Sequence, residues 1–457
     1  MKHISSQSRP DTQASARRLW RIGLPIAVGM GATIGLGVTD TLVAGLAGAD
    51  AIAALAIGAN VFIVAVMLLV GLSSVVAPRI SRLAGAGRFP EVVRDCRRSA
   101  WLGFYSGLLL SLVLWLARPV IFQLGLVDAV AALAASYVSV VVFALPLLGL
   151  CSALRNVLDG LHRTATTMRV SLLVFVANAL LDLLLVPGWG GLPAMGPVGC
   201  AWATVAVSGL QCVLLLRAVL ADPRLTGLDL RGLCRPPRFA ELGALAALGL
   251  PAAFALTLEE GFFSATVWLA APLGTAVLAA HQLLLSLTMM FLTLPIGLGQ
   301  AGAILVGEAL GRDGGRATGL VVRRILRQVM LIMSVSAALA AMTGLWLLPV
   351  YNDDVAVNAL VFSVLPLCAV QLLADGFQIT SGIILKGYQD TLRPGLHVMV
   401  ACWLVGFPLA WLLSRGTLLP AVDGLPGIWI GMFLAVSLVA ALNGQRLYAF
   451  SHDPGTV

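Results

Sequence analysis

A single acidic residue, Asp40, interrupts an otherwise apolar run that extends from Leu24 to Ala47. An α-helix rises about 1.5 Å per residue, so about 20 apolar residues are enough to cross the hydrocarbon core of a bilayer. The run therefore predicts a membrane-spanning helix with an acid inside it. A charged group at that depth costs at least about 2.5 kcal/mol, and such residues usually mark a site for an ion, a proton or a substrate. The alternative is that Asp40 lies at the outer surface of the membrane and is simply hydrated.

The rest of the chain repeats this apolar pattern. Hydrophobic residues make up 59% of the 457 residues and charged residues only 11%, whereas a soluble domain carries roughly 25% charge. Long continuous runs predict helices, because barrel strands are short and alternate in polarity. We therefore expect an all-α membrane protein with twelve transmembrane helices, near residues 19–46, 51–78, 99–117, 129–153, 170–187, 198–216, 242–271, 276–306, 328–350, 355–385, 395–414 and 425–447.

The basic residues indicate how the chain is oriented. If the N-terminus is cytoplasmic, 27 of the 29 Lys and Arg residues fall in cytoplasmic segments, and only Arg118 and Arg415 fall outside. The positive-inside rule then places both termini of a multi-pass membrane protein in the cytoplasm. The location that we expect is a plasma membrane, the bacterial inner membrane. The net charge of +8 faces anionic lipid head groups in this arrangement, so we expect no nucleic-acid partner.

The seven cysteines are scattered and form no CxxC pair, so neither a disulfide framework nor a metal site is indicated. We expect no cofactor, no metal and no obligate protein partner.

The two halves of the chain resemble each other at a nearly fixed offset. Gly71 and Gly85 match Gly297 and Gly311 at an offset of 226, and later matches drift to 227 and 228. Six helices per repeat preserve the orientation of each repeat, so we predict two pseudo-symmetric lobes related by an axis along the membrane normal, with the substrate path between them. The expected divisions are a tail (1–18), an N-terminal lobe (19–220), a cytoplasmic linker (221–240), a C-terminal lobe (241–450) and a second tail (451–457).

Five acids fall inside the predicted spans, while no Lys or Arg falls well inside one. This excess of negative charge suits a cation. Asp40 and Asp182 lie six and five residues before the outer ends of their helices, about 9 and 7.5 Å deep. Asn178 precedes Asp182 by one helical turn and could hydrogen-bond both acids. The alternative is that Asp182 reaches outer water near Trp189.

The other three acids, Glu259, Glu260 and Asp375, belong to the second half. Glu259 is nominally about 18 Å from the outer end of its helix and Asp375 about 30 Å from the outer start of its own. These depths disagree, so the sequence leaves open whether the two side chains meet. Glu260 points about 100° away from Glu259, and we expect at most one of the two to line the main cavity.

Several other residues are candidates with ordinary structural alternatives. Pro25 could act as a hinge, although proline is common in membrane helices. His281 is more often a hydrogen-bonding partner between helices than a proton carrier, and Gln282 follows it. Phe291, with Phe262, Phe263 and Trp268, could stack on a cationic substrate, but we expect most of these aromatic side chains to be core.

These features resemble the multidrug and toxic compound extrusion (MATE) family of cation-coupled exporters. The most specific matches are Asp40, the segment APLGTAVLAAHQ at 271–282 and ADGFQITSGIILKGYQDTLRP at 374–394, which contains Asp375-x-x-Gln378. Glu259 and Asp375 occupy positions where the NorM-like branch carries its carboxylates. The Asn178-x-x-x-Asp182 spacing instead resembles the DinF-like branch, which pairs that Asp with the helix-one Asp, so the chain resembles both branches at once.

The resemblance implies an antiporter that exports amphipathic, mostly cationic drugs in exchange for H+ or Na+ by alternating access. A second possibility within the superfamily is a flippase or exporter of a specific lipid-linked or pigment-like molecule. An intramembrane enzyme is disfavoured, because neither an aspartyl-protease pair nor a His-Glu-x-x-His motif is present.

Overall fold

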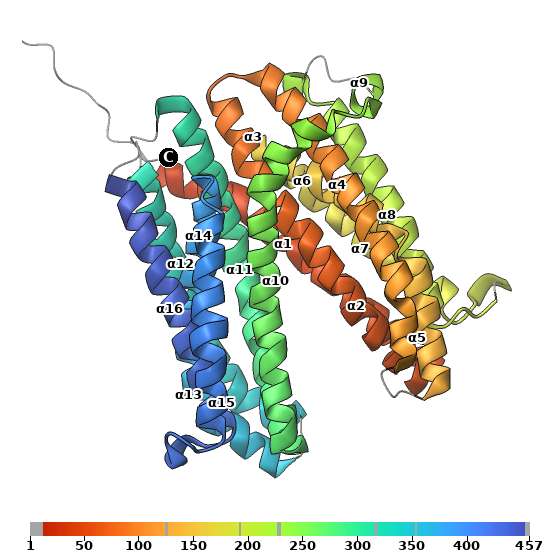
Figure 1. Ribbon diagram of the computed structural model, residues 1–457, viewed down its shortest axis with the longest axis vertical. Helices are drawn as coiled ribbons and strands as arrows, with labels where there is room; N and C mark the ends of the chain where they lie inside the picture. Colours follow the sequence, from red (N-terminus) through yellow and green to blue (C-terminus); the bar gives the residue numbers. More distant parts are fainter. Residues whose placement is uncertain are drawn as a thin grey trace, which may run out of the picture.

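The structure is a computed structural model that describes residues 12–123, 127–191, 193–225, 230–314, 318–351 and 354–452. The described residues form helices joined by short connections (Figure 1). The helices of the first half are α1 (Thr12–Ala44), α2 (Ala49–Ser73), α3 (Val76–Gly85), α4 (Phe89–Ala117), α5 (Asp128–Val141), α6 (Ala144–Gly160), α7 (Thr164–Leu185) and α8 (Pro197–Leu220).

A short helix, α9 (Leu230–Cys234), lies in the connection to the second half. The helices that follow are α10 (Phe239–Ala270), α11 (Thr275–Asp313), α12 (Thr318–Tyr351), α13 (Val355–Gly387), α14 (Leu392–Val398), α15 (Phe407–Ser414) and α16 (Leu425–His452). A π-helical segment, Met399–Gly406, joins α14 to α15.

The membrane-spanning pattern is confirmed. In the described part of the chain, 11 helical segments are long and apolar enough to cross a membrane, or 12 if α5 and α6 are counted as one bent span. Each of the twelve predicted runs falls on one of these segments. The helices extend beyond several runs, so that Arg155 lies within α6 and Lys386 within α13. Both side chains are half-buried, and both lie past the ends of the predicted runs.

Proline explains both of the interrupted spans. α5 and α6 meet at an angle of 47°, where Pro146 lacks the N–H that would bond the carbonyl of Val142. Ser111 of α4 donates its hydroxyl to that carbonyl at 2.8 Å instead. Pro78 has the same effect on the carbonyl of Ser74, and the second span divides there into α2 and α3.

Two groups of helices lie close together at one end of the molecule and diverge towards the other (Figure 1). One group contains α2–α8 and the other α11–α16. The end at which they meet carries the start of α1, helix α9 and the C-terminal end of α16, and we call it the terminal face. The opposite end, with the α1–α2 and α10–α11 connections, is the far face.

The contacts between the halves come in reciprocal pairs. A Cβ added at Gly85 would lie 2.5 Å from the carbonyl oxygen of Glu308, and a Cβ at Gly311 would lie 1.9 Å from that of Arg82. Residues 85 and 311, and residues 82 and 308, are both 226 apart, so each contact is the symmetry mate of the other. The same reciprocity holds for Gly71 with Ala253 and Gly297 with Ala27, and for Gly23 with Leu298 and Gly249 with Leu72. Only glycine permits these backbone approaches. The lobe boundaries themselves stay a prediction.

The hydrophobic core at the terminal face crosses between the halves. Leu19, Ile22 and Ile26 of α1 are buried in one cluster with residues of α11, α12, α13 and α16. The start of α1 is therefore packed against the second half, although the helix continues into the first half. This crossing brings the beginning of α1 beside the end of α11.

Candidate functional site

The structure brings Asp40, Asn178 and Asp182 together between α1 and α7. The side-chain nitrogen of Asn178 donates to Asp40 Oδ1 at 2.7 Å and to Asp182 Oδ2 at 2.6 Å. The four-residue spacing places Asn178 and Asp182 on one face of α7, and that face packs against α1. One amide thus uses both of its N–H groups to bridge two carboxyl groups.

Burial excludes the alternative in which Asp182 reaches outer water. Asp182 is 0% exposed and Asn178 is 1% exposed, while Trp189 is exposed. Asp182 Oδ1 and Asn178 Oδ1 are both buried without a hydrogen-bond donor. Buried polar atoms nearly always have a partner. A proton carried by one of the acids would turn an acceptor into a donor and supply the missing bond.

A second cluster joins α10 to α13. Gln378 donates its side-chain N–H to Glu259 Oε1 at 3.1 Å, and Asp375 lies one turn earlier on the same helix. Asp375 is only 2% exposed, and its Oδ2 has no hydrogen-bond partner. The hydrogen bond from Gln378 therefore brings Glu259 of α10 against the face of α13 that carries Asp375, a proximity that the sequence had left open. Glu260 is exposed on the same helix as Glu259.

Gln371 is a member of this second cluster that the sequence reasoning missed. It lies one turn before Asp375, is 0% exposed, and has neither amide atom in a hydrogen bond. The signal was available in the spacing, because Gln371, Asp375 and Gln378 recur at intervals of four and three residues and so share one helical face. Together they form a polar stripe along the buried side of α13.

Asp159 is a further buried acid that the sequence reasoning missed, because the fourth apolar run ends before it. It is 3% exposed near the end of α6 and accepts a hydrogen bond of 2.7 Å from the hydroxyl of Thr167. Position 159 corresponds to Lys386 at the offset of 227. The two halves therefore carry opposite charges at equivalent places.

The remaining candidates are not hydrogen-bonded to either cluster within the described residues. Gln282 is exposed at the start of α11, and Phe291 is half-buried against the core of the second half. Pro25 lies within α1, which runs through it without a break. Phe262 is fully buried, as expected for core, whereas Trp268 is 80% exposed and so is not core.

His281 is a structural link, and its tautomer follows from its partners. Trp429 Nε1 lies 3.1 Å from His281 Nδ1 and can only donate. Nδ1 therefore accepts, and Nε2 carries the hydrogen that it directs at the hydroxyl of Thr266, 3.1 Å away. That hydroxyl donates in turn to the carbonyl of Phe263. A neutral histidine thus joins α10, α11 and α16.

Comparison with known proteins agrees with the duplicated architecture. The sequence pattern of the MatE family matches the chain twice, over residues 25–184 and over residues 251–412. The chain is 29% identical to a probable multidrug resistance protein NorM of Pasteurella multocida, covering 97% of this chain and 96% of that protein. It is 30% identical to a probable multidrug resistance protein NorM of Mannheimia succiniciproducens, with coverage of 95% and 93%, and 28% identical to a multidrug resistance protein MdtK of Edwardsiella ictaluri, with coverage of 96% for both.

Solved structures of low sequence identity share the fold. The crystal structure of a MATE mutant aligns with a TM-score of 0.86 at 17% identity, covering 97% of both chains. The eukaryotic MATE transporter AtDTX14 aligns with a TM-score of 0.84 at 18% identity, covering 95% of this chain and 96% of that one.

Proposed function

The chain belongs to the MATE family of membrane transporters and is not an enzyme, and we propose that it is an antiporter that exports amphipathic, mostly cationic drugs in exchange for protons. The NorM and MdtK relatives are named as multidrug resistance proteins, which supports drugs as the substrate class. The single observation that carries the coupling proposal is the bridge from Asn178 to Asp40 and Asp182.

The geometry of this first cluster favours the proton over sodium. Two carboxyl groups and one amide can share a proton among acceptors that otherwise lack a donor. A sodium ion would require additional oxygen ligands, as hard cations do. Among the described residues, the neighbouring hydroxyls of Thr39 and Thr41 make hydrogen bonds to carbonyls of their own helix, at 2.9 Å each, and none to the cluster. We therefore assign H+ as the coupling ion and keep Na+ as the outcome that the experiment below would detect.

Both clusters take part in this proposal. Asp40, Asn178 and Asp182 would form a DinF-like proton site in the first half. Glu259 and Asp375, with Gln378, would form the NorM-like cation or substrate site in the second half. Since each cluster lies within one half, protonation of either can alter how that half packs without first separating the two halves. Antiport needs ion binding to favour one of two arrangements of the halves.

We also propose the orientation and location given by the charge pattern: the bacterial inner membrane, with both termini and the linker in the cytoplasm. The terminal face is then cytoplasmic. Cys234 is exposed in the connecting segment and provides a natural reporter. In intact cells it should resist an impermeant thiol reagent, whereas a cysteine introduced at the exposed Val127 on the opposite side should react. Rapid labelling of Cys234, lost in Cys234→Ser, would reverse the orientation.

The substitution Asp40→Asn tests the proton site. It removes the titratable group but keeps a side chain of the same size, so the protein should insert and bind drug but lose gradient-driven efflux. Drug-induced proton release from purified protein should fall at least about tenfold, because the shared proton has no carboxyl group on α1. Asp50→Asn is the matched control, since Asp50 is an exposed acid at the start of the next helix. Equal proton release from wild type and Asp40→Asn would remove Asp40 from the mechanism.

A parallel experiment addresses the second cluster. Glu259→Gln and Asp375→Asn should each lower dye efflux several-fold while the protein remains in the membrane. Glu260→Gln should transport almost normally, because that side chain is exposed and outside the cluster. Efflux measured with the proton and sodium gradients collapsed separately identifies the ion. Dependence on sodium alone would keep the sites but change the ion.

A further inference from the structure

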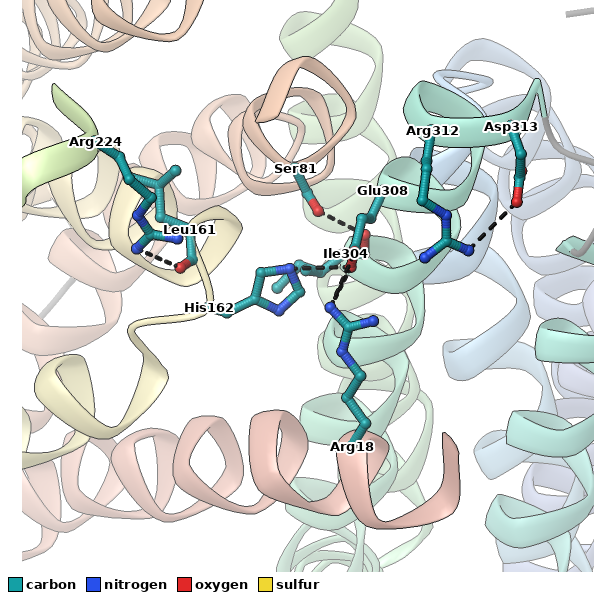
Figure 2. Close-up of polar contacts among 9 residues, drawn as sticks. All are labelled: Arg18, Ser81, Leu161, His162, Arg224, Ile304, Glu308, Arg312 and Asp313. Atoms are coloured by element: carbon teal, nitrogen blue, oxygen red, sulfur yellow. Dashed lines mark hydrogen bonds and ion pairs between the residues drawn. The ribbon is translucent and has the colours of Figure 1, made fainter. Parts of the chain in front are cut away.

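One carboxylate at the terminal face contacts two basic side chains that the first half of the sequence supplies. Arg18 Nη2 lies 2.9 Å from Glu308 Oε1 and 2.7 Å from Oε2, and His162 Nε2 lies 3.2 Å from Oε2 (Figure 2). Arg18 lies in the second turn of α1, His162 occupies the turn between α6 and α7, and Glu308 lies near the end of α11. The Glu308 side chain is only 17% exposed, which limits the screening of these contacts by water.

This network lies over a close backbone contact between the halves. Ser81 of α3 donates its hydroxyl to the carbonyl of Ile304 at 2.8 Å, one turn before Glu308 (Figure 2). The carbonyl of Glu308 itself abuts Gly85. The two halves therefore cannot separate at this face while Glu308 keeps both partners.

The turn that carries His162 is held in an uncommon conformation. His162 has φ of 58°, in the left-handed region that non-glycine residues seldom adopt. Its N–H bonds the carbonyl of Asp159 at 2.9 Å, and Arg224 donates to the carbonyl of Leu161 at 2.8 Å (Figure 2). These bonds hold the backbone of the turn in place. The Cα of His162 is therefore fixed at a position from which the imidazole reaches Glu308.

We propose that Arg18, His162 and Glu308 form a latch that holds the two halves together at the terminal face and must break before they can part there. The latch acts on the conformational equilibrium, so it operates with any exported compound and either coupling ion. Its strength sets how much of the protein is closed at this face.

His162 supplies the latch contact that comes from the turn between α6 and α7. Its Nε2 lies 3.2 Å from Glu308 Oε2, so this contact joins the body of the first half to α11. The other charged groups around the turn are Arg18 on α1, Arg82 on α3, Asp159 on α6, Arg163 and Arg224, which pair with Asp222, and Arg312, which pairs with Asp313 on α11.

Within the part of the chain that the structure describes, two other charged side chains, Arg98 and Lys386, link the halves, and neither replaces the latch. Arg98 pairs with Glu241 at 2.9 Å, but this pair adjoins the covalent connection, where Trp101 also bonds the carbonyl of Leu233. Lys386 donates to the hydroxyl of Ser74 at 3.1 Å, which involves one charge instead of an ion pair. Glu308 is thus the acceptor of the charged link away from the connecting segment.

Distance measurements between spin labels test the latch directly. One pair of labels, at the exposed residues Arg88 and Leu392, reports on the terminal face, and a second pair, at Val127 and Val355, reports on the far face. The full-length chain would be studied in lipid nanodiscs, in a background whose other cysteines are replaced. Glu308→Gln should raise the ratio of long to short distances at the terminal face by about tenfold, the effect of losing charge-assisted hydrogen bonds.

Matched variants separate the latch from general damage. Arg18→Gln should shift the distances in the same direction, and Arg18 is exposed enough to be replaced without unfolding the protein. Arg446→Gln removes an ion pair with Asp390 that stays within the second half and should leave the distances unchanged. Wild-type distances in both Glu308→Gln and Arg18→Gln would overturn the proposal, as would an equal shift in Arg446→Gln.

A third variant isolates His162. His162→Gln should raise the long-distance fraction at the terminal face less than Glu308→Gln does, because the pair of Arg18 with Glu308 remains. Wild-type distances in His162→Gln would refute the role of His162. Because the readout is a distance and not transport, a failed efflux assay leaves this result independent of the proposed function.

Discussion

A methyl group added at Gly311 should act as a wedge between the two halves. A Cβ at this position would lie 1.9 Å from the carbonyl oxygen of Arg82 and 3.0 Å from the backbone nitrogen of Ala86. Non-bonded atoms pack at about 3.5 Å, so α3 and α11 would have to separate by more than roughly an ångström. Both atoms belong to backbone, which cannot rotate away as a side chain could.

The cost of this overlap can be compared with the population it shifts. Overpacking costs typically about 1–3 kcal/mol. Each 1.4 kcal/mol is about a tenfold change in an equilibrium constant, so Gly311→Ala should move the ratio of closed to open terminal faces by about 5- to 150-fold. The gain in helix propensity from Gly to Ala, about 1 kcal/mol, belongs to both arrangements because α11 stays helical in each.

Spin-label distances at Arg88 and Leu392 are the assay, and Gly243→Ala is the matched control. Gly243 is also a helical glycine of the second half, but a Cβ there would meet nothing within 4 Å. The control should keep the closed distance, whereas Gly311→Ala should populate a longer one. Gly85→Ala, the symmetry mate with a 2.5 Å approach, should give a shift of the same sign.

Identical distance distributions in Gly311→Ala and Gly243→Ala, with both proteins folded, would refute the reasoning. They would mean that the backbones adjust locally and that close packing does not govern closure at this face. If the distances change in Gly311→Ala but not in Gly85→Ala, then only the closer of the two backbone contacts, the one at Gly311, controls closure.

Three further predictions concern stability. Hydrogen bonds and charge from Arg224 hold the pKa of Asp222 well below its usual range, so the stability advantage of wild type over Asp222→Asn should be constant above about pH 5 and shrink as the pH falls below about 4, measured by thermal unfolding. Trp429→Phe leaves Nδ1 of His281 without its donor and should cost about 1–3 kcal/mol in unfolding free energy, while the pH profile of efflux stays unchanged; a shifted profile would make His281 a proton carrier after all. Ser111→Ala removes one of two hydrogen bonds to the carbonyl of Val142, which keeps the N–H of Leu145 at 3.1 Å, and should cost about 0.5–1.5 kcal/mol; an unchanged melting temperature would show that the bond from Leu145 is sufficient.

The spans could be predicted because a helix that crosses a bilayer must be long and apolar, and such runs can be found in the sequence without any structure. The interruptions were less visible. Pro78 and Pro146 look like the other prolines within spans, yet at these two positions the helix divides, while α1 continues through Pro25. Which outcome occurs depends on the partner that satisfies the freed carbonyl, and Ser111 lies 31 residues from Val142.

The depth of each acid, counted in residues from the end of its helix, correctly paired Asp40 with Asp182. The same count wrongly separated Glu259 from Asp375. Asp40 and Asp182 are a few residues from well-marked helix ends, so the error in depth is small. α13 has 33 residues, or about 50 Å, and exceeds a hydrocarbon core of about 30 Å. The depth calculated for Asp375 therefore counted residues of α13 that lie outside the membrane. For this reason it did not indicate that Gln378, one turn later, could bond Glu259.

The latch could not be predicted from the sequence. Arg18 and Glu308 are 290 residues apart, and both lie at the polar ends of apolar runs, where charged residues are ordinary. Nothing in their local spacing distinguishes them from Arg312 and Asp313 nearby. Only the crossing of α1 into the second half brings them together, and that crossing depends on tertiary packing.

The reciprocal contacts have a consequence for how such a molecule can be assembled. Glu308 occupies the place that Arg82 occupies in the first half. Two copies of the first half joined through the same glycine contacts would set Arg82 of one copy against Arg18 and His162 of the other, twice over. Two arginines and a histidine would then crowd each junction with no carboxylate among them, where the natural chain has Glu308. The backbone surfaces are self-complementary while the charges are not, so the first half expressed by itself should not form a homodimer and should pair only with the second half.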